Sequence, residues 1–149
     1  MAEPSSAQRL AEHVRDGLFA GDRASQALGM QVTEIGPGRA VLTMRVREDM
    51  LNGHGMCHGG VIATLADSAF AFASNAGNEL TVSSGLAIDF ITPAHCGDVL
   101  EARCAEVFRT GRTGVYDATV SNQRGECLAV FRGRSYAMRG KTAVPINGS

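Results

Sequence analysis

The chain has 149 residues, of which 44% are hydrophobic and 19% charged, a composition typical of one globular domain spanning residues 1–149. Its 14 basic and 15 acidic residues leave a net charge of −1, so neither nucleic acid nor a membrane is expected as a partner. No apolar stretch reaches the ~20 residues of a membrane span and no secretory signal begins the chain, so a cytoplasmic location is expected.

The first predicted element is a short amphipathic helix. Residues 5–19 place apolar side chains at four-residue spacing, and Ser5 or Ser6 is available as an N-cap. The helix is expected to end near Gly21 and to pack on the outside of the core. The residues before it, 1–6, are polar and small, and we expect them to be frayed.

A β-hairpin is predicted next. Residues 30–35 and 40–46 are β-like runs, and the Gly-Pro-Gly sequence at residues 36–38 between them is typical of a turn. A loop over residues 47–58 follows the hairpin.

The central segment from residue 59 to about residue 75 is long enough for four helical turns and is apolar nearly all round, which predicts a helix buried on several sides. Every later regular segment has a strand pattern, namely residues 81–91, 99–110, 113–122 and 127–139. The fold class expected is α+β, with a mostly antiparallel sheet curled around one long apolar helix. Residues 140–149 are expected to be frayed.

The beginning of this helix has the features of an acyl-transfer site. Gly59 lies where the loop becomes the helix, so its backbone N–H has no partner within the helix and carries the positive end of the helix dipole. Because glycine lacks a Cβ, a carbonyl oxygen can approach that amide and be stabilised as it becomes negative.

Asp67 is the candidate carboxylate. From Gly59 to Ala73 there are fifteen residues and one charge, and an acid in such a segment is rarely buried without a partner. Hydrolysis by acyl transfer needs a carboxylate that activates water or attacks the carbonyl itself. Burial is expected to raise the pKa of Asp67 unless local donors, such as Thr64 and Ser68, oppose it.

Gly59 and Asp67 are too far apart on one helix to act on one carbon, because eight residues span about 12 Å. In a two-fold dimer with antiparallel helices side by side, Gly59 of one subunit meets Asp67 of the other. The expected minimum active unit is therefore a homodimer with two composite sites.

The segment NGHGMCHGGVIATLADSAFAF, with SSGLAIDFITPA, GRTGVYD and FRGRS after it, resembles the hotdog-fold acyl-CoA thioesterases, and in particular the phenylacetic acid degradation subgroup. The resemblance runs from about residue 24 to residue 140 and includes a compact HGG(x)6D motif. It implies a homotetramer built as a dimer of dimers, and hydrolysis of phenylacetyl-CoA or its ring-hydroxylated relatives. Neither a metal nor an organic cofactor is expected, since coenzyme A enters as part of the substrate.

The resemblance also implies roles for individual residues. The Gly59 amide would polarise the thioester carbonyl, Asp67 would be the catalytic carboxylate, and Asn52 and His58 would orient the site from the loop. Ser83, ten residues before Pro93, would help to position the attacking water.

Each of these residues has a structural alternative. Asp67 would then cap or bridge a dimer interface, and His58 would close the loop by bonding to backbone, alone or together with a role in the site. Asn52 precedes a glycine and on pattern alone is a turn former. The choice of Ser83 over Ser84 depends on the resemblance.

Two other chemistries are disfavoured. His54, Cys57 and His58 could suggest a metal site, but the intervening glycines oppose the helix that would present the histidines together, and no further ligand is evident. Cys57 beside His58 mimics a nucleophile and its base, yet adjacent side chains normally diverge. With no CxxC pair among Cys57, Cys96, Cys104 and Cys127, reduced thiols are expected, most of them packed as small apolar groups.

Two groups of larger side chains have less specific assignments. Phe70 and Phe72 are expected in the core rather than in the wall of an acyl pocket. Four arginines at strand ends or alternating strand positions are expected to be solvated, although some could pair with coenzyme A phosphates: Arg109, Arg112, Arg132 and Arg134.

Three alternative functions remain open from the sequence. The first is a thioesterase for another acyl-CoA, of medium-chain or benzoyl type. The second is a hotdog dehydratase, which is weaker because that chemistry needs a catalytic histidine paired with an acid. The third is a non-catalytic acyl-CoA-binding module, in which the acid at position 67 would be expected to be absent or replaced.

Overall fold

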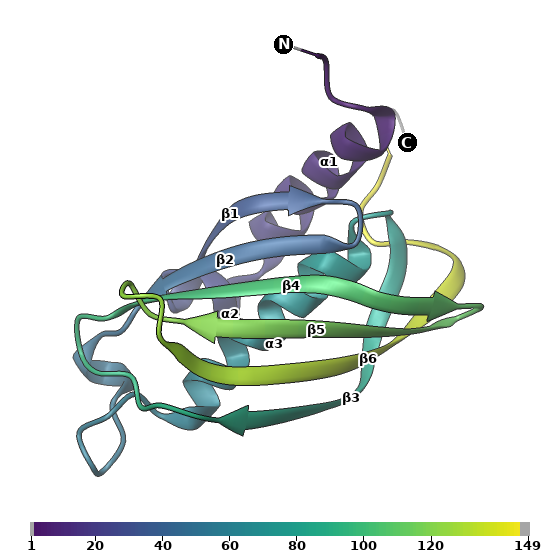
Figure 1. Cartoon of the computed structure of the whole chain (residues 1–149). Helices are drawn as coiled ribbons and strands as arrows, with labels where there is room; N and C mark the ends of the chain where they lie inside the picture. Colours follow the sequence, from purple (N-terminus) through teal and green to yellow (C-terminus); the bar gives the residue numbers. More distant parts are fainter. Residues whose placement is uncertain (1, 147–149) are drawn as a thin grey trace.

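The computed structural model describes residues 2–146 of the chain (Figure 1). Its elements in chain order are α1 (Ser6–Gly21), α2 (Arg23–Ala27), β1 (Gln31–Gly36), β2 (Arg39–Arg45), a 3₁₀ turn (Glu48–Met50), α3 (Gly59–Asn75), β3 (Glu79–Phe90), β4 (Val99–Thr110), β5 (Thr113–Ser121) and β6 (Cys127–Thr142). The predicted first helix, hairpin, central helix and four later strands are all present, with ends within a few residues of those expected.

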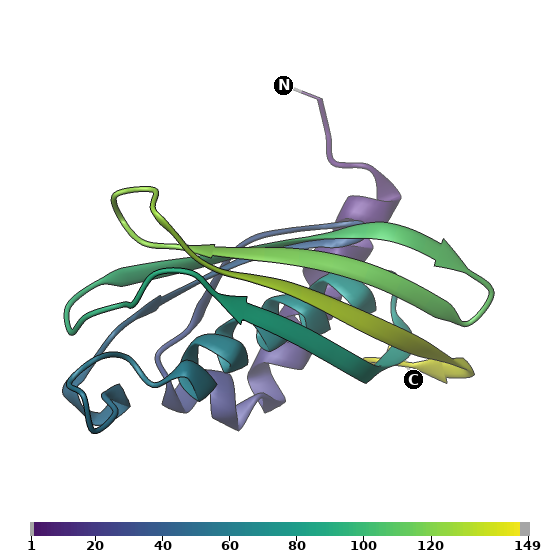
Figure 2. The same cartoon turned by 60° about the horizontal axis from the view of Figure 1, so that its bottom comes forward.

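The strands form one six-stranded sheet in the order β1-β2-β4-β5-β6-β3, and every pairing is antiparallel. The sheet curves over α3, and all the helices lie on the same side of it (Figures 1 and 2). Since β1 and β3 lie at its two edges, the sheet is not closed. The expected α+β arrangement, an antiparallel sheet wrapped around one long apolar helix, is confirmed.

Aromatic packing holds helix α3 against the sheet and against α1. The Phe70 ring packs at 5.4 Å from the ring of Tyr116 and 5.8 Å from that of Phe131, while Phe72 packs against Phe19 at 6.4 Å. Both phenylalanines of α3 are 2% exposed, so their assignment to the core is confirmed. Among residues 2–146, no helix is both long and apolar enough to cross a membrane.

Close packing of α3 on β6 requires a glycine in the strand. A Cβ on Gly133 would lie 2.7 Å from Cε2 of Phe70, which is shorter than real side chains allow. The absence of a side chain at Gly133 therefore lets the Phe70 ring lie directly against the sheet.

Helix α1 begins at the predicted cap, because the Ser5 hydroxyl accepts a hydrogen bond from the Gln8 amide. It ends at Asp22, whose side chain also caps α2 by accepting from the Ser25 amide at 3.0 Å. Helix α2 was not predicted, because its five residues are too few to show a periodic pattern. Its one sequence signal is the cap residue Asp22.

The C-terminal segment is more regular than its predicted fraying suggests. Strand β6 continues to Thr142, and Val144 exchanges two hydrogen bonds with the side chain of the buried Asn78. Of the segments expected to fray, residue 1 and residues 147–149 lie outside the described residues.

Strand β3 is an edge strand with an unusually apolar exposed surface. Val82 is 46% exposed, Leu86 45% and Phe90 53%. Its outer edge is free of strand pairing along the described chain. An edge of twelve residues with exposed apolar side chains is a typical place for another strand to pair.

Candidate active site

Asn52 organises the loop that leads into α3. Its side-chain oxygen accepts hydrogen bonds from the amides of His54 (2.9 Å) and Met56 (3.2 Å), and its own amide donates to the Met56 carbonyl at 2.7 Å. These bonds are those of a turn former, the structural alternative given by the sequence. A contact between Asn52 and substrate stays a prediction.

His58 is the N-cap of α3. Its Nδ1 accepts a hydrogen bond from the Gly60 amide at 2.9 Å, and its backbone carbonyl accepts one from the Val61 amide at 2.9 Å. The His58 amide donates to the carbonyl of Met50 at 2.8 Å. Because Nδ1 is an acceptor, the neutral ring carries its proton on Nε2, which is free to face the solvent.

These caps leave Gly59 as the donor without a partner. Among the described residues, no acceptor receives a hydrogen bond from the Gly59 amide, although the amides on both sides of it are bonded. The helix dipole adds positive potential at this point. The Gly59 N–H is therefore available to stabilise an oxyanion, as the sequence led us to expect.

Asp67 lies two turns further along α3, and its side chain is half-buried. Burial raises the pKa of its partly buried carboxyl group. The neighbouring hydroxyls do not oppose this, since Thr64 donates to the Gly60 carbonyl at 2.7 Å and Ser68 pairs with Ser25 at 3.1 Å. In the described part of the chain, the Asp67 carboxylate has neither a hydrogen-bond donor nor a cation as a partner.

Ser83 faces the same side of the sheet as the central helix. It pairs across the strands with Ser135, which is 4% exposed and points toward the core. Ser84 occupies an irregularity of the strand and donates its hydroxyl to the Arg134 carbonyl at 3.1 Å. Ser83 is thus the serine of the two whose hydroxyl has no such bond, and its role with water stays a prediction.

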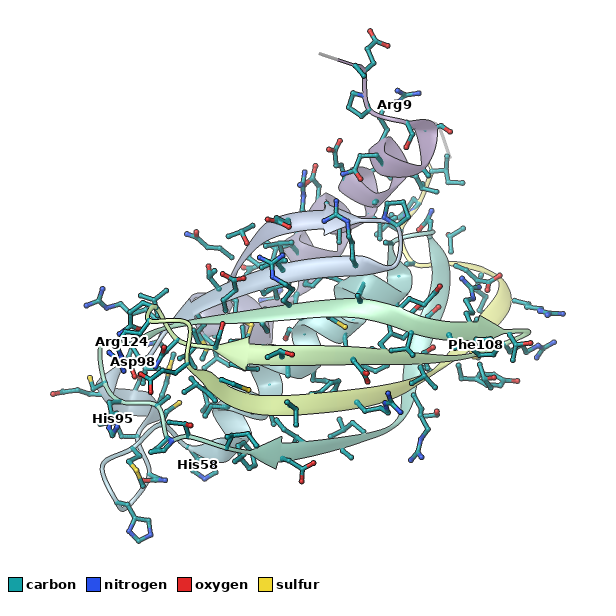
Figure 3. All side chains as sticks on the ribbon, viewed as in Figure 1. Arg9, His58, His95, Asp98, Phe108 and Arg124 are labelled. Carbon is teal, nitrogen blue, oxygen red and sulfur yellow. The ribbon has the colours of Figure 1, made fainter. Side chains whose placement is uncertain are left out.

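The structure brings Asn52, His58 and Gly59 together at one end of the molecule, where Figure 3 labels His58. It does not bring Asp67 to them, because the same helix separates it from Gly59 by about 12 Å. Phe90 is a residue of this region that the sequence did not single out. Its ring lies beside Gly59. Alternation counted from Ser83 would put Phe90 on the opposite face of the strand, and the irregularity between Ser83 and Gly85 brings both side chains to the face that α3 covers.

The alternative chemistries receive no support from the geometry. Within residues 2–146, no three His, Cys, Asp or Glu side chains are grouped as metal ligands. Cys57 is buried, and its pKa is raised by that burial and by the negative charge of Asp98, so its thiol is poorly suited to act as a thiolate nucleophile. Cys104 is also a buried free thiol.

Two of the four candidate arginines form ion pairs with carboxylates within the described chain, and Arg112 donates to the Tyr136 hydroxyl at 3.1 Å. Arg132 forms two hydrogen bonds with the carboxylate of Asp117, at 2.7 and 2.8 Å, and Arg109 pairs with Glu79 at 2.9 Å. All of these side chains are exposed, as expected for solvated charges. Contacts of the arginines with coenzyme A phosphates stay a prediction.

Comparison with known proteins supports the same chemistry. A family model described as "Thioesterase superfamily" matches residues 54–129, which include the last part of the loop, α3, β3, β4 and β5. The acyl-coenzyme A thioesterase PaaI of Escherichia coli is 41% identical over 123 residues, covering 83% of this chain and 88% of that protein.

Solved structures agree with this match. The structure of the E. coli PaaI protein from the phenylacetic acid degradation operon superposes with a TM-score of 0.89 at 39% identity, covering 92% of this chain and 99% of that one. A Streptococcus mutans protein solved with acetyl CoA bound has a TM-score of 0.73 at 25% identity, covering 76% and 91%.

The open antiparallel sheet around α3, with a free helix N-terminal amide and an isolated carboxylate, is that of a hotdog-fold acyl-CoA thioesterase. The chain belongs to the thioesterase superfamily, and within it to the PaaI-type group of the phenylacetic acid degradation thioesterases.

Proposed function

We propose that this protein hydrolyses phenylacetyl-CoA or ring-hydroxylated phenylacetyl-CoA to the free acid and coenzyme A, in the degradation of phenylacetate. The thioesterase class follows from the family, and the acyl group is our inference from the PaaI relatives. The enzyme acts as a single domain in the cytoplasm and needs neither a metal nor an organic cofactor.

The observation that carries this proposal is a pair of unpaired groups on one helix. The Gly59 amide has no acceptor and the Asp67 carboxylate has no donor among the described residues. Each is costly to leave unpaired in a partly buried position unless a ligand uses it. An amide donor and a carboxylate are the two groups that thioester hydrolysis requires.

The active unit that we propose is a homodimer, two of which form a homotetramer. In it, two copies of α3 lie antiparallel, so that Gly59 faces Asp67 of the partner subunit. The free, apolar outer edge of β3 supports such an association, because it can continue the sheet into a second copy. Ser83 lies on this strand and would reach the composite site with it.

In the proposed reaction, the thioester carbonyl oxygen accepts a hydrogen bond from the Gly59 amide. In one alternative, the carboxylate of Asp67 from the partner subunit removes a proton from a water positioned by Ser83, and the water oxygen adds to the carbonyl carbon. In the other, the carboxylate itself adds to that carbon. In both, the carbon–sulfur bond then breaks, and the coenzyme A sulfur leaves with the bonding electrons and takes up a proton. The second alternative leaves an anhydride between the acyl group and Asp67, which water hydrolyses to the free acid and the free carboxylate. Asn52 and His58 hold the loop in place.

The two roles of Asp67 predict different fates for solvent oxygen. In a single turnover in ¹⁸O-labelled water, a nucleophilic Asp67 takes the label into its own side chain when water opens the anhydride at the Asp67 carboxyl carbon. A general base sends the label only into the acid product. Label found by mass spectrometry in the peptide that contains Asp67 would therefore identify Asp67 as the nucleophile.

The test of function is thiol release from a panel of phenylacetyl-, hydroxyphenylacetyl-, benzoyl- and straight-chain acyl-CoA thioesters. We expect the highest kcat/KM with the arylacetyl thioesters, and a loss of 10²-fold or more in Asp67→Ala, the scale of an acid-base or nucleophilic group. A preference for straight-chain or benzoyl thioesters would instead assign another acyl-CoA as substrate. Tight binding without turnover by the native protein would indicate a binding module.

A further inference from the structure

Phe90 is the last residue of β3, at the free edge of the sheet and next to the beginning of α3. Two residues earlier in the strand, Ile88 pairs with the buried Phe131, so the alternation of the strand directs Phe90 to the face that α3 covers. Its side chain is nevertheless 53% exposed, because no further strand lies beyond β3.

The tip of the Phe90 ring lies against the backbone of Gly59. A Cβ on Gly59 would be 3.1 Å from Cζ, 3.4 Å from Cε1 and 3.5 Å from Cε2 of this ring. The missing side chain at Gly59 therefore makes room for the aromatic ring as well as for an approaching carbonyl. The Phe90 ring thus adjoins the residue whose amide is free.

Within residues 2–146, the Phe90 ring has no aromatic partner. The ring pairs among the described residues join Phe19 to Phe72 and Phe70 to Tyr116 and Phe131, and Phe90 takes part in none of them. A half-exposed aromatic ring beside an unpaired donor is typical of a ligand-binding surface, in which an apolar wall surrounds a few polar groups.

We propose that Phe90 is the aromatic wall of the acyl-binding pocket and a determinant of specificity for aromatic acyl groups. This deepens the proposed function and rests on the proposed role of the Gly59 amide. When a thioester oxygen accepts a hydrogen bond from that amide, the atoms one or two bonds from the carbonyl carbon come within contact of the Phe90 ring. A phenyl group there reaches the centroid separations of about 4.5–7 Å at which aromatic rings attract one another.

The experiment compares two thioesters of nearly equal size, phenylacetyl-CoA and cyclohexylacetyl-CoA, so that the ratio of their kcat/KM values reports on aromatic contact. In Phe90→Leu, which removes the ring and keeps an apolar side chain, we expect the ratio to fall about 3- to 10-fold. Phe90→Tyr retains the ring, and its ratio should stay close to that of the native enzyme.

A matched control is Phe108→Leu. Phe108 is 63% exposed, lies on β4 and is labelled in Figure 3 at the end of the sheet opposite to His58. The Phe108→Leu variant should leave the ratio of the two kcat/KM values unchanged. Light scattering of all variants provides the oligomeric mass, since Phe90 also lies on the edge strand that we assign to the dimer.

Two other results with Phe90→Leu would overturn the proposal, and the substrate preference of the native enzyme tests the proposed function separately. An unchanged ratio in Phe90→Leu, or an equal loss for both thioesters with a smaller oligomeric mass, would make Phe90 an interface residue. An equal rise of KM for both thioesters in Phe90→Leu would mean that Phe90 contacts the coenzyme A part of the substrate rather than the acyl group. If the native enzyme prefers benzoyl thioesters, the proposed function fails, and benzoyl-CoA against cyclohexanecarbonyl-CoA tests Phe90 in the same way. If the native enzyme accepts no aromatic acyl group, both proposals fail.

Discussion

The amide of Cys57 donates a 2.8 Å hydrogen bond to the backbone carbonyl of Ala94, which attaches the loop between β3 and β4 to the residue immediately before His58. The side chain of Asp98 braces the same loop. It accepts hydrogen bonds from the His95 amide at 2.9 Å and from Gln123 at 2.8 Å. Figure 3 shows His95, Asp98 and Arg124 gathered at the end of the molecule where His58 lies. The loop that leads into α3 is thus held indirectly by Asp98.

Asp98→Ala should destabilise the protein by about 1–3 kcal/mol, because it leaves two donors without their acceptor in a position that is 6% exposed. Urea denaturation at pH 7 measures the change. Asp49→Ala is the matched control, since it removes an exposed carboxylate paired with Arg47 and should barely move the midpoint. An equal effect of both variants would show that the two hydrogen bonds to Asp98 contribute no more to stability than a surface ion pair.

The same hydrogen bonds to Asp98 predict that the stability of the protein depends on pH. The hydrogen bond from Gln123, then that from the His95 amide, lowers the pKa of Asp98 below its usual value. A carboxyl group with a lowered folded-state pKa stabilises the fold above its unfolded pKa of about 3.9, and this contribution is lost as the pH falls through the lower, folded value. The stability difference between the native protein and Asp98→Ala should therefore shrink below about pH 4. A constant difference down to pH 2 would contradict this.

His58→Ala should cost about 1 kcal/mol of stability, because the Gly60 amide loses its cap. His58→Asn should recover most of this loss, since asparagine is among the best N-cap residues. Thermal unfolding compares the two variants. If the asparagine variant is stable and still slow with thioesters, the histidine acts in the site as well as in the cap. Full activity in that variant would limit His58 to closing the loop.

The raised pKa of Asp67 predicts that removing its charge stabilises the folded protein near neutral pH. Its pKa is raised by burial, so the folded protein favours the protonated form, and the stability that this gives is present at low pH and lost as the pH rises through the folded pKa. Asp67→Asn should therefore unfold at a higher temperature than the native protein at pH 7 to 8, with the gap closing toward pH 4. Asp16→Asn, which changes an exposed acid on α1, is the control. A lower melting temperature for Asp67→Asn at pH 8 would contradict the assignment.

The raised pKa of Asp67 should also appear in the kinetics. The ionised carboxylate is the reactive form of either a base or a nucleophile, so kcat/KM should fall as the pH drops through a value above the usual 3.9 of an aspartate. A pH profile of kcat/KM with a phenylacetyl thioester measures this fall at low pH. A profile that stays flat down to pH 4 would argue against Asp67 as the titrating group.

Mixed dimers test whether two chains build each site. Gly59→Val and Asp67→Ala should each be inactive alone, since one blocks the amide and the other removes the acid. When the two chains are unfolded together in equal amounts and refolded, half of the dimers should be mixed, and each mixed dimer has one intact composite site. Activity should then return to about one quarter of the native value. Recovery below one per cent would mean that both groups act within one chain.

The positions of most helices and strands could be predicted from the local sequence pattern. Gly59 and Asn75 bound the central helix as predicted, because an uninterrupted apolar run after two glycines has few conformations that bury it. The turn at residues 36–38 and the strand alternation likewise depend on neighbouring residues. The HGG(x)6D spacing indicated the family, and the separation of about 12 Å between Gly59 and Asp67 is the reason for proposing a second chain.

The tertiary structure decided which polar groups are hydrogen-bonded within the chain and which have no partner there. The sequence offered Ser68 as a donor for Asp67, but Ser68 pairs with Ser25 of α2, a helix too short to predict. The position of Phe90 beside Gly59 depends on which strand lies at the sheet edge. Strand order and burial arise from contacts between residues far apart in the chain, and local propensity carries no information about them.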